Sequence, residues 1–186
     1  LASTGDASAG SDEIVSTAIN TTGASLIVIG VSAFTAITST PTDSQSNGWT
    51  ALTARGTTAA ATFPFWYKAA PTTNAAHTFT FNQIASFPTI FAAAFDGTVT
   101  TTPADQENGT AAASGTSQAT GSVTPTENDE LIIAGFTVDG AITNLAINAG
   151  LTIAQQEAIV PSGGMGGAIA WLQQVTAAAI NPSWSW

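Results

Sequence analysis

The chain has no cysteine among its 186 residues and very little positive charge. The missing cysteines exclude disulfide bonds and thiolate metal sites. Only 2 residues are Lys or Arg, against 12 Asp or Glu, which gives a formal net charge of −10. Nucleic acid is therefore not expected as a partner, since phosphate binding needs clustered cations. An anionic membrane surface is disfavoured for the same reason.

Long apolar runs and helical periodicity are also scarce. No run approaches the ~18 apolar residues that a membrane span requires, so no membrane insertion is expected. No stretch repeats its apolar residues at helical spacing. The chain begins with Leu1 and not with Met, which predicts a processed or partial chain.

Charged residues make up only 8% of the chain, against roughly 25% in an ordinary soluble domain. Thr, Ser, Asn, Gln and Gly supply the polar surface instead, and the hydrophobic content of 44% is ample for a core. Uncharged, Thr- and Ser-rich surfaces suit like subunits that pack side by side, and proteins exposed on a virion or outside the cell. A general compositional bias of the source would give the same picture.

One apolar segment occurs twice. LIVIG at residues 26–30 returns as LIIAG at residues 131–135, a spacing of 105 residues. Trp66 and Trp171 have the same spacing, HTFTF at 77–81 is answered by PSWSW at 182–186, and GWT at 48–50 by GLT at 150–152. We predict two similar halves packed face to face, about residues 12–97 and 98–186, with the repeated segments on equivalent, mostly buried strands related by a pseudo-two-fold axis.

Short runs rich in β-branched and aromatic residues alternate with turn signals every 8–14 residues. This pattern predicts an all-β, jelly-roll-like β-sandwich of ten or eleven strands. Residues 12–186 are expected to form its single domain. Residues 1–11, which are small and polar, are expected to form a flexible N-terminal arm.

Four segments carry a resemblance to known proteins: TTGASLIVIGVS (21–32), NGWTALT (47–53), PADQENGTA (103–111) and TPTENDELIIAGFTVDG (124–140). Together they resemble jelly-roll, concanavalin- or lectin-like β-sandwich modules of phage and virus structural proteins and of secreted bacterial surface proteins. The likeness covers about residues 12–186 and implies a structural or surface-binding role with no catalytic set. Such modules have a further strand after the segment that ends here at Trp186.

Candidate metal ligands lie in the acidic loop around Asp105 and Glu107, which offers carboxylate oxygens to calcium. Solvated acidic turns are the alternative interpretation of the same residues. No other cofactor is expected. Asn20 and Asn108 begin N-glycosylation sequons in predicted turns, and the sequence does not decide whether they are used.

No catalytic set emerges. His77 is the only histidine and sits inside a regularly alternating strand, and no GxSxG turn is present. The sequence does not exclude a pair of carboxylates that hydrolyses glycosides, because the distance between two carboxylates cannot be read from a sequence. The aromatic residues favour sugar binding over sugar hydrolysis, and Trp49 is the candidate ring on which a sugar would stack.

The repeat stops after Trp186, where the first half continues with the apolar residues 87–95. The second half should therefore be one strand short, with an open edge or apolar groove beside Trp184 and Trp186. A neighbouring subunit's N-terminal arm, or residues 12–20 of the same chain, is expected to cover this assembly edge. We predict a non-enzymatic structural protein that forms a homo-oligomer or part of a larger assembly. Its expected place is a virion surface, the cell surface or an extracellular filament. The alternative is a carbohydrate-binding surface module with glycan partners.

Overall fold

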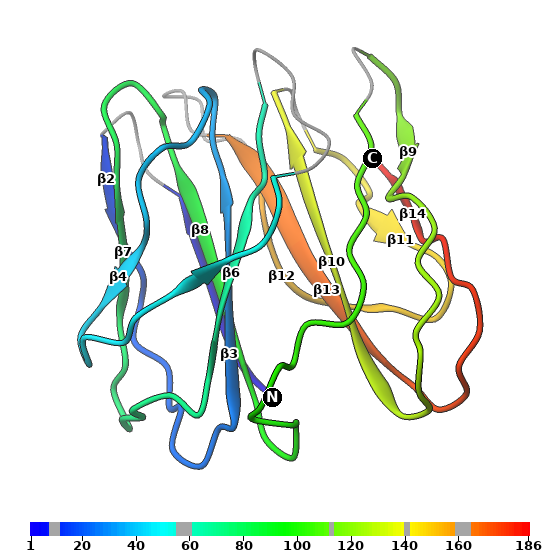
Figure 1. Ribbon diagram of the computed structural model, residues 1–186. Coiled ribbons are helices and arrows are strands. Elements are labelled where there is room, and N and C mark those ends of the chain that lie inside the picture. Colours follow the sequence, from blue (N-terminus) through cyan, green and yellow to red (C-terminus); the bar gives the residue numbers. More distant parts are fainter. Residues whose placement is uncertain (8–11, 55–60, 112–113, 140–141, 159–164) are drawn as a thin grey trace.

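The computed structural model describes residues 1–7, 12–54, 61–111, 114–139, 142–158 and 165–186 (Figure 1). These residues form fourteen β-strands and no helix, and hence no helical span for a membrane. The expected ten or eleven strands were too few because several strands have only two or three residues. Segments this short carry too few alternating positions to be recognised in a sequence.

The strands form four antiparallel sheets stacked as four layers (Figure 1). The two middle layers are the first inner sheet, of strands β1 (Ala2–Ala7), β8 (Thr89–Phe95), β3 (Leu26–Ser32), β6 (Phe65–Ala69) and β5 (Thr50–Ala51), and the second inner sheet, of β10 (Glu130–Val138), β13 (Gly166–Gln174) and β12 (Thr152–Glu157). The outer layers are the first outer sheet, of β2 (Glu13–Val15), β7 (Phe79–Asn82) and β4 (Thr42–Asp43), and the second outer sheet, of β11 (Ala146–Ile147), β14 (Ser183–Ser185) and β9 (Ser117–Ala119).

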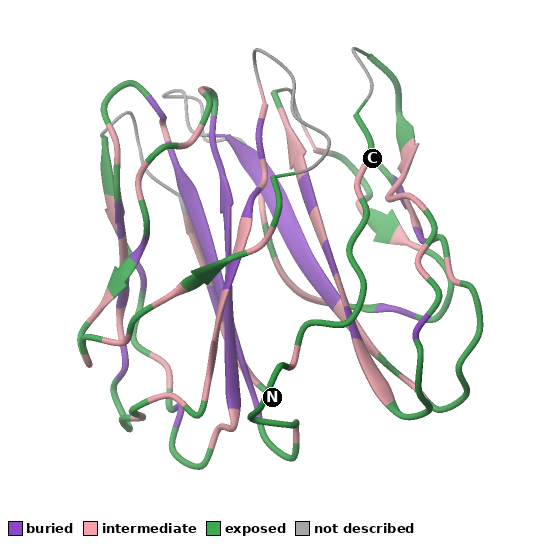
Figure 2. Ribbon diagram, viewed as in Figure 1, coloured by how far each residue is buried: buried purple, intermediate pink, exposed green. Residues whose placement is uncertain are grey.

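Three apolar cores separate the four layers. One lies between each inner sheet and its outer sheet, and the third lies between the two inner sheets. Strands β3 and β8 have a core on both faces, and all of their residues are buried (Figure 2). This position explains why both strands are written as continuous apolar runs without alternation.

The predicted internal duplication is present. Strands β2 to β7 correspond, in chain order, to strands β9 to β14, because each pair has the same neighbours in the same sheet. In the first half β7 lies between β2 and β4, and in the second half β14 lies between β9 and β11. Each half is thus a β-sandwich of its own, and the order β1-β8-β3-β6 over β2-β7-β4 is jelly-roll-like.

Equivalent residues of β3 and β10 face each other across the middle of the molecule. The hydroxyls of Ser32 and Thr137, which are 105 residues apart, share a hydrogen bond. A Cβ atom added to either Gly30 or Gly135 would lie 2.4 Å from Cε1 of Phe63. The glycine that ends both copies of the repeated segment therefore leaves room for one phenylalanine ring between the inner sheets. These contacts are those of two halves related by an approximate two-fold axis.

The sequence repeat predicts that Trp66 and Trp171 are equivalent residues, but they lie on opposite faces of their strands. Trp66 points into the core of the first half and is 4% exposed, whereas Trp171 points between the two inner sheets. The counterpart of Trp171 is Tyr67, since Val28 pairs with Tyr67 as Ile133 pairs with Trp171. One residue fewer separates the two strands in the second half, and a shift of one residue turns a strand's side chains to its other face.

The burial of the two repeated segments also differs. All residues of β3 are buried, but in β10 buried Ile132 and Ala134 alternate with half-buried Leu131 and Ile133. The expectation of a mostly buried segment thus holds for the first copy only. The reason is that β3 has a neighbouring strand on each side, whereas β13 is the one described strand that pairs with β10.

The N-terminal segment contains a strand. Strand β1 pairs with β8, from Ala2 opposite Ala94 to Ala7 opposite Thr89, and residues 8–11 lie outside the described residues. Strand β2 pairs with β7. Neither β1 nor β2 lies beside β10, so within this chain neither the arm nor the start of the domain closes the edge left open in the second half.

Candidate functional site

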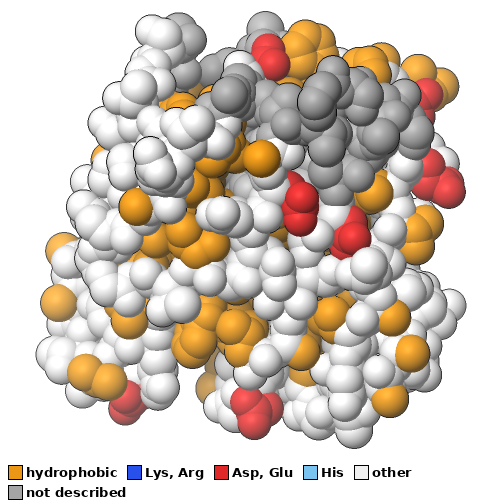
Figure 3. All heavy atoms as spheres, turned by 180° about the vertical axis from the view of Figure 1, so that it is seen from behind, with side chains coloured by type: hydrophobic (Ala, Val, Ile, Leu, Met, Phe, Trp, Pro, Cys, Tyr) orange, Lys and Arg blue, Asp and Glu red, His pale blue; other side chains and the backbone are white. Residues whose placement is uncertain are grey.

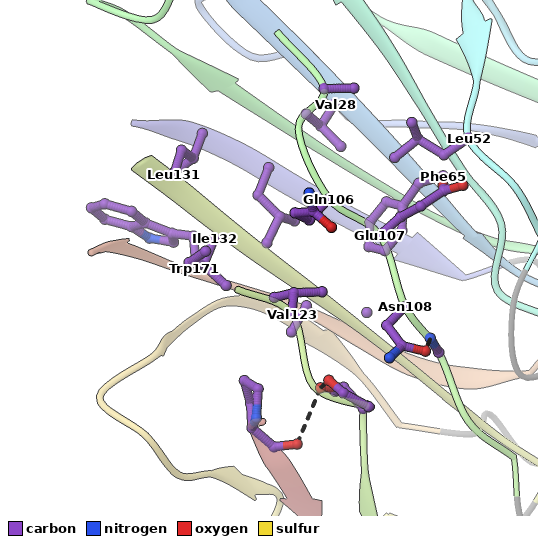
Figure 4. A pocket seen from close by; sticks show the side chains of 18 of the residues that line it. Val28, Leu52, Phe65, Gln106, Glu107, Asn108, Val123, Leu131, Ile132 and Trp171 are labelled. Atoms are coloured by element: carbon purple, nitrogen blue, oxygen red, sulfur yellow. Dashed lines mark hydrogen bonds between the residues drawn. The ribbon is translucent and has the colours of Figure 1, made fainter. Parts of the chain in front are cut away.

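Among the described residues, strand β10 has a strand on one side only, and a groove lies along its other side (Figure 4). In the first half the equivalent side of β3 carries β8. The groove has a volume of about 1570 Å³, which exceeds the ~300–1,000 Å³ of small-molecule pockets. We call it the β10 groove. Its apolar lining comes from both halves and includes Val28, Phe65, Tyr67, Leu131, Ile133 and Trp171.

The far wall of the β10 groove is the linker, residues 98–111, which connects β8 to β9 without regular structure. It occupies the place that β1 has in the first half. Strand β1 lies beside β12, where Gln155 Nε2 donates to the carbonyl oxygen of Ser3 at 3.3 Å. The linker lies beside the end of β5, the counterpart of β12, where the Thr53 N–H donates to Glu107 Oε2 at 2.9 Å. The space between β10 and the linker is therefore the space of the missing counterpart of β8.

Side chains, and not a backbone ladder, hold the linker in place. Asp105 accepts the N–H of Thr126 at 2.9 Å and the hydroxyl of Thr126 at 3.0 Å. The bond from the Thr126 backbone lowers the pKa of the Asp105 carboxyl, because it favours the charged form. Asn108 donates to the carbonyl oxygen of Ser122 at 2.8 Å. In the described residues no backbone–backbone hydrogen bond joins the linker to β10.

The charged side chains described in the groove lining are acidic, and Arg55 lies outside the described residues. Seven carboxylates belong to this lining, those of Asp96, Asp105, Glu107, Glu127, Asp129, Glu130 and Asp139. They surround an apolar floor, so the groove combines burial for apolar side chains with a negative rim. The opposite face of the molecule, seen in Figure 3, is mostly uncharged, with patches of hydrophobic side chains, several acids and no cation among the atoms described there.

The two predicted calcium ligands lie in the linker but do not form a cluster. Asp105 binds Thr126 and Glu107 binds Thr53, as described above. Within the residues that the structure describes, no three His, Asp or Glu side chains come close enough together to hold a metal ion. Calcium at this loop stays a prediction on which nothing below depends.

The predicted assembly edge is on the wrong strand. Trp184 belongs to β14, which is the middle strand of its sheet and is paired on both sides. Its side chain is 2% exposed and packs on Phe136, and Trp186 packs on the same ring. Both tryptophans line the β10 groove, but the open edge itself belongs to β10. The predicted groove beside Trp184 and Trp186 is therefore present, and the predicted open edge lies on another strand.

Trp49, the candidate sugar platform, packs against the core of the first half. Its ring meets Phe79 edge-on at a centroid distance of 6.1 Å, and its Nε1 is buried without a hydrogen-bond partner. The aromatic side chains that border an open space include Phe65, Tyr67 and Trp171. The strand alternation of Phe65, Trp66 and Tyr67 could have indicated two aromatic residues facing away from the first core.

His77 takes part in a buried polar network that the sequence analysis missed. Its Nδ1 lies 2.9 Å from the Thr21 hydroxyl, and its Nε2 lies 3.2 Å from Asp43 Oδ1, close enough for an ion pair but out of line for a hydrogen bond. The order of hydroxyl, imidazole and carboxylate matches a catalytic triad. The imidazole and the carboxylate are 0% exposed, however, so the network has no contact with solvent or substrate and holds strands together.

Comparison of the chain with protein-family models, curated proteins and solved structures found no match. The interpretation of the β10 groove therefore depends on its own geometry.

Proposed function

We propose that this protein is a non-enzymatic structural component that joins a larger assembly, either of its own copies or on another particle. The observation that carries the proposal is the open side of β10. An edge strand with unpaired N–H and C=O groups readily accepts another strand, and proteins normally shield such edges. Here the edge is accompanied by apolar residues of both halves that are only half-buried.

The setting that fits this proposal is a virion surface, the cell surface or an extracellular filament. The Thr- and Ser-rich composition, with only 8% charged residues, lets subunits approach with few charges to desolvate. The absence of cysteine leaves the fold independent of the redox state of its surroundings.

A lysine placed in the groove tests this function. Ile133→Lys puts a charge among the groove's apolar residues, and Ile84→Lys places the same charge at a side chain that is 81% exposed and outside the groove. Sedimentation velocity over a concentration series, with and without the strand peptide described below, should show assemblies or a complex with the peptide for the unaltered protein and Ile84→Lys, but not for Ile133→Lys. A protein that is monomeric at all concentrations and also rejects the strand peptide described below would overturn the proposal.

Carbohydrate binding is the second candidate. The rings of Tyr67 and Trp171 and the amides of Gln106 and Asn108 all line the groove, and sugar sites combine aromatic rings with hydrogen-bonding groups. A glycan array should then give ligands that Tyr67→Ala loses and Trp49→Ala retains. No binding on the array removes this candidate and leaves the first unaffected.

A further inference from the structure

We propose that the β10 groove binds one extended strand from a partner protein, antiparallel to β10, with a β8-like apolar pattern and lysine or arginine at its ends. This inference rests on the proposed function and specifies the partner's chemistry. The first half of the molecule supplies the template. There, β8 lies between β3 and β1 and pairs with both. In the second half, β10 and the linker stand where β3 and β1 stand, and no described strand lies between them.

The backbone of β10 is oriented for this pairing. In β3, the N–H groups of Val31 and Ala33 donate to the β6 side, at Pro64 and Thr62. Neighbouring residues of a strand present their backbone groups to opposite sides, so the even-numbered residues of β3 face β8. With the offset of 105 residues, the groups that face the groove are those of Leu131, Ile133, Gly135 and Thr137. These four residues are the proposed docking ladder.

The side-chain pattern of the incoming strand follows from the contacts of β8. Phe95 packs edge-on against Trp171, with ring centroids 5.9 Å apart. The counterpart of Trp171 is Tyr67, which lines the groove. The incoming strand should therefore carry an aromatic residue at the position of Phe95, where it would pack on Tyr67.

One position must differ from β8. Phe91 lies against Gly167, where an added Cβ would be 3.1 Å from the Phe91 ring. The counterpart of Gly167 in the first half is Phe63, whose ring already fills the space between the inner sheets and stacks on Phe91 at 5.8 Å. The incoming strand should therefore have a small residue at the position of Phe91.

The charge of the groove decides between a partner protein and a second copy. The seven acidic residues named above line the groove, and their negative charges attract a strand with cationic ends at short range. Another copy of this chain carries a net charge of −10 and only two cationic residues. Its approach brings like charges together, so a partner with a basic-flanked apolar segment fits the groove better.

A synthetic peptide tests the proposal on the intact protein. The probe carries the sequence of residues 89–95 with the change Phe91→Ala, between two lysines at each end. Amide hydrogen exchange followed by NMR should show slowed exchange at Leu131, Ile133, Gly135 and Thr137 when the peptide is added. Two control peptides have proline in place of Ala93, which removes a ladder hydrogen bond, or glutamate in place of the flanking lysines. The proline peptide should not bind, and the glutamate peptide should bind more weakly at low salt.

Variants of the protein report on the rim charge. Glu127→Gln removes a groove carboxylate and should weaken binding of the lysine peptide about two- to fivefold, the range of one exposed ion pair. Glu157→Gln, which removes a carboxylate outside the groove, should leave the affinity unchanged.

Three results would overturn the inference. The lysine peptide fails to bind, it binds without protecting the β10 amides, or the protein alone protects those amides and sediments as a dimer. In the last case a second copy is the occupant. Homo-oligomers that form with the β10 amides still unprotected, and no peptide binding, would sink this inference while leaving the proposed assembly function in place.

Discussion

The two halves of the molecule share six strands in the same order, and only the first half is complete. In the first half β8 closes the inner sheet and β3 is buried on both faces. In the second half the corresponding place is empty of described strands, and six of the nine residues of β10 remain half-buried. The comparison shows that the burial of one face of a repeated strand depends on whether a second neighbouring strand is present beside it.

The halves also differ in how they fill one position of their outer sheets. In the first half His77 bridges to Ile19, and Asp43 pairs with Phe79. In the second half Ile147 pairs with Trp184, the counterpart of Phe79, and Pro182 precedes Trp184 by two residues as His77 precedes Phe79. The imidazole and the carboxylate of the first half thus correspond to a proline and an isoleucine in the second.

The largest expected difference between the halves concerns their central isoleucines. Ile29→Ala should lower the free energy of unfolding by about 2–5 kcal/mol, because it leaves a cavity in a closed core. Ile133→Ala should cost only about 1–2 kcal/mol, because its side chain is already half-exposed in the groove. Urea unfolding of both variants measures the contrast. Equal losses would mean that the groove is filled in solution.

Replacing the two buried polar side chains by isoleucine tests the network between them. His77→Ile or Asp43→Ile alone should each cost about 1–3 kcal/mol, because the remaining polar group is buried without its partner. The double variant should cost less than the sum of the two, since apolar pairs often replace buried polar pairs well. A double-mutant cycle by chemical denaturation gives the coupling energy between His77 and Asp43. Strictly additive losses in the free energy of unfolding would argue against an interaction between the two side chains.

The two equivalent glycines should respond as a coupled pair. Gly30→Ala and Gly135→Ala each press on Phe63 and should cost roughly 1–3 kcal/mol by overpacking. Their combined cost should be below the sum, since one displacement of the Phe63 ring relieves both. Gly48→Ala is the control, because an added Cβ meets nothing within 4 Å there. Additive losses in thermal unfolding would place the two glycines against independent neighbours.

The smallest expected effect is pH-dependent and belongs to the contact between β1 and β12. Burial, and then the nearby charge of Asp6, raise the pKa of the Glu157 carboxyl. Its charged form is therefore less favourable in the folded state, and stability is lost as the pH rises above the ordinary value of about 4.3. Glu157→Gln should raise the Tm by roughly 1 °C at pH 7, since the group is partly solvent-screened.

At pH 3, where Glu157 is protonated in both states, the Tm gain from Glu157→Gln should disappear. Asp139→Asn, at an exposed position, controls for the loss of one negative charge. A gain that is the same at both pH values would assign the effect to packing.

Much of the architecture could be predicted because it is written as local pattern. The apolar run at residues 26–30 and its copy at 131–135 indicated two equivalent strands, and the spacing of the repeat indicated that one strand of the second half was missing. The positions of β4, β5 and β11 could not be predicted, because two residues are too few to show a period. The partners of His77 were also invisible, because Thr21 and Asp43 are distant in the sequence.

By itself, the sequence determined the all-β class, the duplication and the excess of acidic over basic residues, since strand alternation, repeat spacing and charge are properties of the chain alone. Only the tertiary structure decided that Trp171 corresponds to Tyr67, that β14 lies in the middle of its sheet, and that the open edge belongs to β10. The physical reason is that a strand's neighbours and the direction of its side chains depend on register. A shift of one residue, which barely changes a sequence repeat, turns a side chain from one face of the sheet to the other.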